Sequence, residues 1–138
     1  EETNIGMFAD VGTLQRLPKL IPEGVARELA YTGETLDPQR AEKLGLYNAV
    51  LETPEALREH VDAVAAKIAS KAPLTISGTK RSFLYARDHS IADSLEHAMA
   101  LQASYWSPDD IMEAMGARAE KREGEFKPLS PVKRMGRG

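Results

Sequence analysis

Residues 2–18 form the sequence ETNIGMFADVGTLQRLP, in which two acidic side chains, Glu2 and Asp10, lie eight residues apart. Gly6 stands between them and lets the chain bend, because glycine has no Cβ to restrict its backbone. A short helix should follow and end at Pro18. The residues around the acidic pair are apolar: Ile5, Met7, Phe8 and Val11. The stretch therefore predicts a bent loop that holds two carboxylates on apolar surface.

The composition is that of a globular protein. Of the 138 residues, 42% are apolar and 28% are charged, which is enough to form a core. The net charge of -3 gives no global basic field for nucleic acid. Cys is absent, which excludes disulfides, thiolate metal sites and a Cys nucleophile. No apolar run approaches the roughly 20 residues that span a bilayer, and no secretory signal opens the chain. We therefore expect neither nucleic acid nor a membrane as partner.

The three histidines do not suggest a metal site. His60, His89 and His97 lack the spacing of metal ligands and have no companion nucleophile pattern, so surface or packing roles are expected. Tyr105 and Trp106 end a helical stripe, where core or interface is the default role.

The first region of the chain has little regular structure. Residues 22–32 place apolar side chains on one helical face, and Gly33 follows where a helix commonly ends. Asp37, followed by a proline, predicts the start of another short helix. Residues 47–51 are predicted to form a strand. Because the region of residues 1–52 cannot bury its own faces well, we interpret it as the trailing edge of a larger sheet-containing domain.

From residue 53 the pattern becomes helical. Thr53, followed by Pro and Glu, is a strong start signal, and Pro73 should end that helix. A second helix is expected over residues 75–87. The first of these helices has an apolar stripe: Leu57, Val61, Val64 and Ile68. The region of residues 53–126 is therefore predicted to be a helical subdomain.

Two serines predict the remaining helices. Ser90 has Asp93 three residues later, as in a capping box, and Ser107 precedes Pro and two aspartates. The helix after Ser90 has a stripe formed by Ile91, Leu95, Met99, Gln102 and Trp106. Residues 127–138 contain prolines, glycines and unopposed basic side chains, which is typical of a mobile, solvated tail.

Several ordered motifs resemble the crotonase (enoyl-CoA hydratase/isomerase) superfamily. In that family a Glu is followed four residues later by Gly and then by a T-x-Q-R-L helix, as in residues 2–18. Residues 29–34 (LAYTGE) and 41–50 (AEKLGLYNAV) are similar to the family's LTG and GLVN-V passages. Residues 107–122 resemble its last helix, which ends in Glu-Lys-Arg. The resemblance covers the chain to about residue 126.

Asp10 points to one branch of the family. Residues 8–18 (FADVGTLQRLP) are similar to the A-A-D-V-G-T-L-Q-R-L-P passage of Δ3,5-Δ2,4-dienoyl-CoA isomerases, whereas hydratases usually place glycine where Asp10 stands. Residues 85–90 (YARDHS) resemble the isomerase passage YSRDHS.

The resemblance also implies the architecture. It implies an α/β crotonase-like (ββα spiral) fold, of which this chain is the mostly α C-terminal part. Residues 1–52 would be the trailing part of the spiral core with an active-site loop, residues 53–126 a helical oligomerisation subdomain, and residues 127–138 a basic flexible tail. The chain begins with Glu1 instead of Met, so a processed end or a fragment is expected, and the motifs favour a fragment.

The implied chemistry needs two carboxyl groups. Removing the α-proton of an acyl thioester gives a dienolate, whose charge lies largely on the thioester oxygen. Backbone N–H donors stabilise that oxygen by about 3–4 kcal/mol each. One carboxyl then acts as base and another as acid at the two ends of the moving electrons. The resemblance implies that Glu2 handles the proton nearer the thioester and Asp10 the distal one.

Other implied features lie partly outside this sequence. The oxyanion donors belong to the N-terminal half in this family, so we expect the chain alone to be inactive. Lys121 matches a family lysine that reaches the CoA phosphates of a neighbouring subunit, although Arg118 replaces the aromatic that usually precedes it by three positions. No metal and no redox cofactor is expected, since the CoA thioester is the substrate.

Simpler interpretations stay open for each residue. Glu2 can be a solvated terminal residue, Asp10 a helix N-cap, and Lys121 an ordinary cation at a helix end. Enoyl-CoA hydratase is the alternative activity, in which Glu2 and an upstream Glu activate water. A non-catalytic oligomerisation module is the alternative of another class.

The resemblance implies an assembly and a location as well. Crotonase relatives form trimers, often paired into hexamers, and the apolar stripes of residues 57–68 and 91–106 are candidate interfaces. The activity would belong to fatty acid β-oxidation. We expect a bacterial cytoplasmic location, or mitochondria or peroxisomes for a eukaryotic protein.

Overall fold

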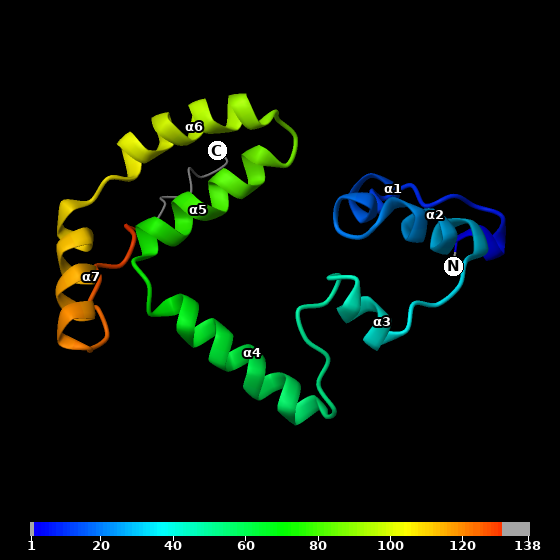
Figure 1. Ribbon diagram of the computed structural model, residues 1–138, viewed down its shortest axis with the longest axis horizontal. Helices are drawn as coiled ribbons and strands as arrows, with labels where there is room; N and C mark the ends of the chain where they lie inside the picture. The colour runs from blue at the N-terminus through cyan, green and yellow to red at the C-terminus, as the bar shows by residue number, and fades with distance from the viewer. Residues whose placement is uncertain (1, 131–138) are drawn as a thin grey trace, which may run out of the picture. The chain divides into compact units, whose positions relative to one another are not determined.

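The computed structural model describes residues 2–130, and in that range every regular element is a helix (Figure 1). The chain divides into two compact units, Glu1–Glu59 and His60–Gly138. The division falls inside a long helix, whereas the boundary expected from the sequence lies just before that helix. Most of the tail expected over residues 127–138 lies outside the described residues.

Short helices make up most of the first unit. Its elements are η1 (Glu2–Ile5), α1 (Thr13–Arg16), η2 (Leu17–Lys19), α2 (Glu23–Thr32) and α3 (Pro38–Lys43). Both η1 and η2 contact α2. Three apolar side chains of this unit are buried, namely Ile21, Ala26 and Ala41.

The helix ends of this unit follow local rules. Gly33 ends α2 in the left-handed conformation, with φ of 66°, as predicted. Asp37 caps α3 as predicted, since its side chain accepts a hydrogen bond from the Arg40 N–H at 3.0 Å. The α-helix α1 ends at Arg16, before Pro18, as predicted. Because the first turn of a helix needs no N–H donor, Pro18 fits into the 3-10 helix η2, which follows α1 directly.

The strand predicted over residues 47–51 is also wrong, since the structure has bends and coil there. A strand needs a neighbouring strand for its alternating donors and acceptors, and none exists within residues 2–130. Local acceptors on α3 take the donors instead. The Tyr47 N–H donates to the Ala41 carbonyl at 3.4 Å, and the Val50 N–H donates to the Glu42 carboxylate at 3.2 Å.

Four longer helices make up the rest of the described chain: α4 (Pro54–Ala69), α5 (Pro73–Ala86), α6 (Ile91–Tyr105) and α7 (Pro108–Glu120). Hydroxyl side chains cap three of them as predicted. Thr53 accepts from the Ala56 N–H at 3.1 Å, Ser90 from Asp93 at 3.1 Å, and Ser107 from Asp110 at 3.3 Å. Pro73 begins α5 two positions earlier than expected, because proline suits the first helical turn.

Helices α5 and α6 lie side by side and form the main packing contact of the second unit (Figure 1). Gly78 on α5 leaves room for the ring of Tyr105, because a Cβ at residue 78 would stand 2.9 Å from the Tyr105 Cδ1. The Tyr85 ring stacks on His89 and on His97, with centroids 3.7 and 3.8 Å apart. His89 is exposed and His97 is half-buried, so both agree with the surface or packing roles expected for them.

The expected apolar stripes are exposed within this chain. On α4, Leu57 is 49% and Ile68 is 49% exposed; on α6, Leu95 is 62% and Met99 is 70% exposed. In the second unit, the buried apolar side chains of the described residues are Ala72 and Ala117. The core that the composition suggested is therefore small within each unit. One expected member of the α6 stripe, Gln102, instead lines a groove between α5 and α6.

Candidate active-site loop

Glu2 lies in a turn that two neighbouring side chains attach to α2. The Thr3 hydroxyl donates to the Ala30 carbonyl at 2.6 Å, and the Asn4 side-chain amide donates to the Gly33 carbonyl at 3.1 Å. The Glu2 side chain is exposed, and a backbone hydrogen bond lowers the pKa of its carboxyl group. Glu2 therefore has a tethered backbone and a carboxylate that faces solvent in this chain.

Asp10 lies between two glycines in the left-handed conformation, Gly6 with φ of 76° and Gly12 with φ of 94°. L-residues with a Cβ adopt this conformation at a cost, so the glycines allow the loop to reverse around Asp10. Gly12, not Asp10, occupies the N-cap position of α1. The interpretation of Asp10 as the cap of α1 is therefore wrong, and its carboxylate is exposed.

Of the two predicted catalytic carboxylates, Glu2 belongs to η1 and Asp10 to the loop after it, and both are exposed within this chain. Four apolar side chains near them are 55–78% exposed: Ile5, Met7, Phe8 and Val11. A cavity of about 250 Å³ between α1, η2 and α2 is lined by other residues, among them Leu14, Ala26 and Tyr31. The enclosure of Glu2 and Asp10 in one apolar site stays a prediction.

Lys121 ends α7 in an unusual backbone conformation. Its φ is 55°, the one positive value for a non-glycine residue in the described part of the chain. The Lys121 N–H donates to the Arg118 carbonyl at 3.3 Å, and the side chain is exposed. The chain thus reverses at Lys121, and its ammonium group stands in solvent.

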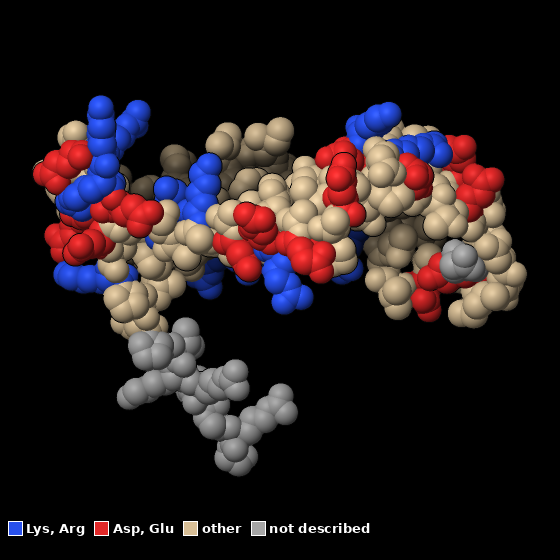
Figure 2. Space-filling view, turned by 90° about the horizontal axis from the view of Figure 1, so that it is seen from below, with Lys and Arg blue, Asp and Glu red and all other residues tan. Residues whose placement is uncertain are grey.

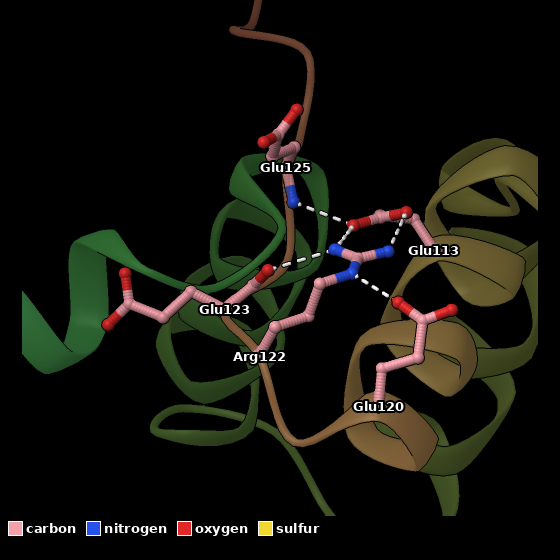
Figure 3. Close-up of polar contacts among 5 residues, drawn as sticks. All are labelled: Glu113, Glu120, Arg122, Glu123 and Glu125. Carbon is pink, nitrogen blue, oxygen red and sulfur yellow. Dashed lines mark hydrogen bonds and ion pairs between the residues drawn. The ribbon is translucent and has the colours of Figure 1, made fainter.

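A charged network that sequence reasoning missed follows Lys121 (Figure 3). The Arg122 guanidinium donates to Glu113 at 2.5 and 3.1 Å, to Glu120 at 2.6 Å and to the Glu123 carbonyl at 2.9 Å. The Glu125 N–H donates to Glu113 at 2.9 Å. Arg122 lowers the pKa of Glu113 to about 2. The network fixes the residues after α7, although no helical spacing in the sequence relates Glu113 to Arg122.

Acidic and basic side chains are mixed on the face that Figure 2 shows. Within residues 2–130, each helix is too short or too polar to cross a bilayer. In the same range, no three His, Asp or Glu side chains gather as metal ligands would.

The chain is similar to known proteins in both sequence and structure. The model of the enoyl-CoA hydratase/isomerase family matches residues 1–128. This chain belongs to the enoyl-CoA hydratase/isomerase family. The crystal structure of the enoyl-CoA hydratase EchA1 from Mycobacterium marinum matches 91% of the chain with a TM-score of 0.80 and 36% identity, over 49% of its own chain. The expected crotonase-like fold is therefore confirmed, with a mostly helical part of it in this chain.

The curated relatives of this chain include proteins named as isomerases and proteins named as hydratases. A Δ3,5-Δ2,4-dienoyl-CoA isomerase from Pongo abelii is 38% identical over 89% of the chain. A crotonyl-CoA hydratase from Syntrophomonas wolfei is 31% identical over 91% of it. The chain spans 38% and 48% of the length of these relatives. Isomerases similar to this chain have "mitochondrial" or "peroxisomal" in their names, so these relatives do not support the bacterial cytoplasmic location expected from the sequence.

Proposed function

We propose that the protein is an acyl-CoA isomerase that converts a 3,5-dienoyl-CoA into a 2,4-dienoyl-CoA. The observation that carries the proposal is the pair of carboxylates eight residues apart, Glu2 on the tethered turn and Asp10 in the loop after it, between two left-handed glycines. The 38% identity to a protein named as a dienoyl-CoA isomerase supports it. Asp10 is the residue that separates this proposal from a simple hydratase.

Each carboxyl group would have one task in the reaction. Glu2 removes the proton at C2, and the electron pair of the broken C–H bond delocalises onto the thioester oxygen to give a dienolate. Asp10 then supplies a proton at C6 while the electrons return from the oxygen along the chain, so that the double bonds end at C2 and C4 and one proton leaves as one arrives. An apolar enclosure would assist, because burial and mutual repulsion separate the proton affinities of two carboxyl groups.

The pKa of the Glu2 carboxyl group would have to rise when the loop is enclosed. A backbone hydrogen bond lowers the pKa of its carboxyl group in the exposed loop, and a carboxylate with a lower pKa is a weaker base. Covering the loop with apolar surface would raise that pKa and make the carboxylate a better proton acceptor. The exposed side chains of Met7 and Phe8 could form part of such a cover.

Hydration of a 2-enoyl-CoA is the second candidate activity. Relatives and solved structures named as hydratases support it at 31% and 36% identity. In that case Glu2 would activate water together with a second Glu outside this sequence, and Asp10 would be dispensable. A non-catalytic assembly module is the remaining alternative, and it requires neither carboxylate.

The other parts of the proposal follow from the substrate class. The partner would be an acyl-CoA, whose phosphates Lys121 would contact, and neither metal nor redox cofactor would take part. The exposed faces of α4 and α6 would mediate assembly into a trimer or hexamer. The activity would serve fatty acid β-oxidation, in mitochondria or peroxisomes if the protein is eukaryotic.

Assays of the full-length gene product with both substrates test the proposal. We expect isomerisation of 3,5-dienoyl-CoA, and a loss of about 10²–10⁴-fold in kcat for Glu2→Gln and for Asp10→Asn. Glu34→Gln and Asp62→Asn are matched controls on exposed acidic residues and should keep full activity. Hydration that survives Asp10→Asn, without any isomerase activity, would replace the proposal by the hydratase. The absence of both activities would favour the assembly module.

A further inference from the structure

The turn that contains Glu2 is attached at the carboxyl end of α2. The last carbonyls of a helix have no partner within the helix and need donors from elsewhere. The Thr3 hydroxyl supplies one to the Ala30 carbonyl at 2.6 Å, and the Asn4 amide supplies another to the Gly33 carbonyl at 3.1 Å. Two consecutive side chains thus link η1 to a helix end that is 27 and 29 residues away in sequence.

The space around the second bond fits the Asn4 side chain closely. Gly33 is buried, and a Cβ placed on it would stand 2.6 Å from the Asn4 Oδ1 and 2.7 Å from the Nδ2. Asn4 therefore occupies the space that any other residue at position 33 would fill. The left-handed conformation that makes Gly33 the end of α2 also leaves this space open.

Backbone hydrogen bonds within the turn connect Glu2 to the residues that are bonded to α2. The Gly6 N–H donates to the Thr3 carbonyl at 3.2 Å, and the Met7 N–H donates to the Glu2 carbonyl at 2.9 Å. The backbone of Glu2 is therefore bonded within the same turn that Thr3 and Asn4 fix to α2. A displacement of the turn would move the Glu2 carboxylate with it. Asp10 lies beyond Gly6, outside this turn.

We infer that Thr3 and Asn4 are positioning residues that hold the Glu2 carboxylate in place for proton transfer. The inference rests on the proposed function, because it assumes that Glu2 is the base. Neither side chain needs to touch the substrate. A shift of about 1 Å in a reacting group can reduce the rate on the order of 10²-fold, so two hydrogen bonds at the base of the turn are enough to matter.

The experiment compares Thr3→Val and Asn4→Ala in the full-length gene product with the matched control Thr53→Val. Thr53 also uses its hydroxyl in a hydrogen bond to the backbone, at 3.1 Å, but at the start of α4. We expect kcat to fall by about 10–100-fold in the two test variants, with KM changed less than about twofold. Thr3→Ser, which keeps the hydroxyl, should restore kcat. Thr53→Val should lower the unfolding midpoint by about as much as the two test variants do, but it should leave kcat unchanged.

A second measurement follows the turn directly, without relying on activity. Amide hydrogen exchange at Gly6 and Met7 should become faster in Thr3→Val and Asn4→Ala and stay unchanged in Thr53→Val. Wild-type kcat in both test variants, failure of Thr3→Ser to restore it, or unchanged exchange at both amides would overturn the inference. If Glu2→Gln abolishes activity while the test variants keep it, the inference fails and the proposed function stands. A wild-type protein without either activity overturns the proposed function itself.

Discussion

Arg122 and Glu113 form a two-pronged ion pair across the end of α7, with nitrogen–oxygen distances of 2.5 and 3.1 Å. Nine residues separate them in the sequence. The chain reverses at Lys121, whose left-handed backbone brings the guanidinium back along the helix. The pair therefore depends on the reversal, and the reversal is held in turn by the pair.

This ion pair predicts a pH-dependent contribution to stability. The Arg122 hydrogen bonds lower the pKa of Glu113 from 4.5 to about 2, and the Glu125 N–H assists. Since the folded-state pKa is depressed, the contribution is fully present above about pH 4.5 and is lost as the pH falls toward 2. We expect Glu113→Gln to have a lower Tm than wild type at pH 7, with the two values converging as the pH falls from about 4.5 toward 2. Thermal unfolding of both proteins between pH 2 and pH 7 measures the difference in Tm.

Asp109 provides the control for that prediction. It pairs with Lys127 at 3.6 Å, and both side chains are more than four-fifths exposed, at 84% and 87%. Solvent screens such a pair, so Asp109→Asn should leave Tm unchanged at pH 7. A constant Tm difference between Glu113→Gln and wild type at all pH values would contradict the role of the ion pair.

Gly33→Ala should destabilise the first unit by about 1–2 kcal/mol, because an L-residue is disfavoured at a φ of 66°. The added methyl group would also displace Asn4 from its position 2.6 Å away. Gly24→Ala is the matched control, since no atom lies within 4 Å of a Cβ there and the position is inside α2. That substitution should stabilise by roughly 0.5–1 kcal/mol. Chemical denaturation measures both, and equal effects of the two substitutions would refute the role assigned to Gly33.

Gly78→Ala should loosen the contact between α5 and α6. The new methyl group would stand 2.9 Å from the Tyr105 Cδ1, so the ring must shift, at a cost of about 1–3 kcal/mol. Tyr105 would then be drawn away from Arg81, which donates to its hydroxyl at 3.2 Å. Gly116→Ala in α7 meets no atom within 4 Å and should be stabilising. Chemical denaturation measures the free energy of unfolding of both variants. A stabilising Gly78→Ala would show that α5 and α6 can move apart without a cost in free energy.

Replacing each of two serines of the α6 region by alanine should have different effects on the free energy of unfolding. Ser90 accepts from the Asp93 N–H at 3.1 Å and donates to the Asp93 carboxylate at 2.6 Å, so Ser90→Ala should cost about 1 kcal/mol. Among residues 2–130, the buried hydroxyl of Ser94 finds no hydrogen-bond partner. Ser94→Ala should therefore be neutral or stabilising, since it removes an unsatisfied polar group. Unfolding free energies of both variants provide the test, and a destabilising Ser94→Ala would point to a partner for that hydroxyl.

The exposed face of α6 predicts an effect on assembly. Leu95 and Met99 are 62% and 70% exposed, one helical turn apart. If this face mediates the proposed trimer or hexamer, Leu95→Glu and Met99→Glu should reduce the mass measured by analytical ultracentrifugation. Ala100→Glu places the same charge on an exposed position of another helix face and should leave the mass unchanged. An equal mass for all three variants would exclude α6 as the interface.

Local features of this protein could be predicted from its sequence because neighbouring residues determine them. The hydroxyls of Thr53, Ser90 and Ser107 lie three residues before the N–H groups that they accept from, so their helix starts are visible in a short window. Gly33 ended its helix as expected for the same reason. The ordered motifs of residues 2–18, 29–34, 41–50 and 107–122 together indicated the family.

Features that depend on distant partners could not be predicted in this way. The strand expected over residues 47–51 needs a neighbouring strand, and the described chain offers none. Asp10 had the chemistry of a helix cap, but a left-handed Gly12 occupied that position. Pairs such as Arg122 with Glu113 have no fixed sequence spacing, so only the path of the chain reveals them.

The sequence by itself determined where α3, α4, α6 and α7 begin and where α2 ends, because those helix ends depend on contacts within a few residues. The order and spacing of its motifs determined the family. Only the tertiary structure decided what Thr3 and Asn4 contact, which apolar faces remain exposed and where Lys121 turns the chain. These depend on groups brought together from positions far apart, and their free energy comes from burial and hydrogen bonds that no local pattern encodes.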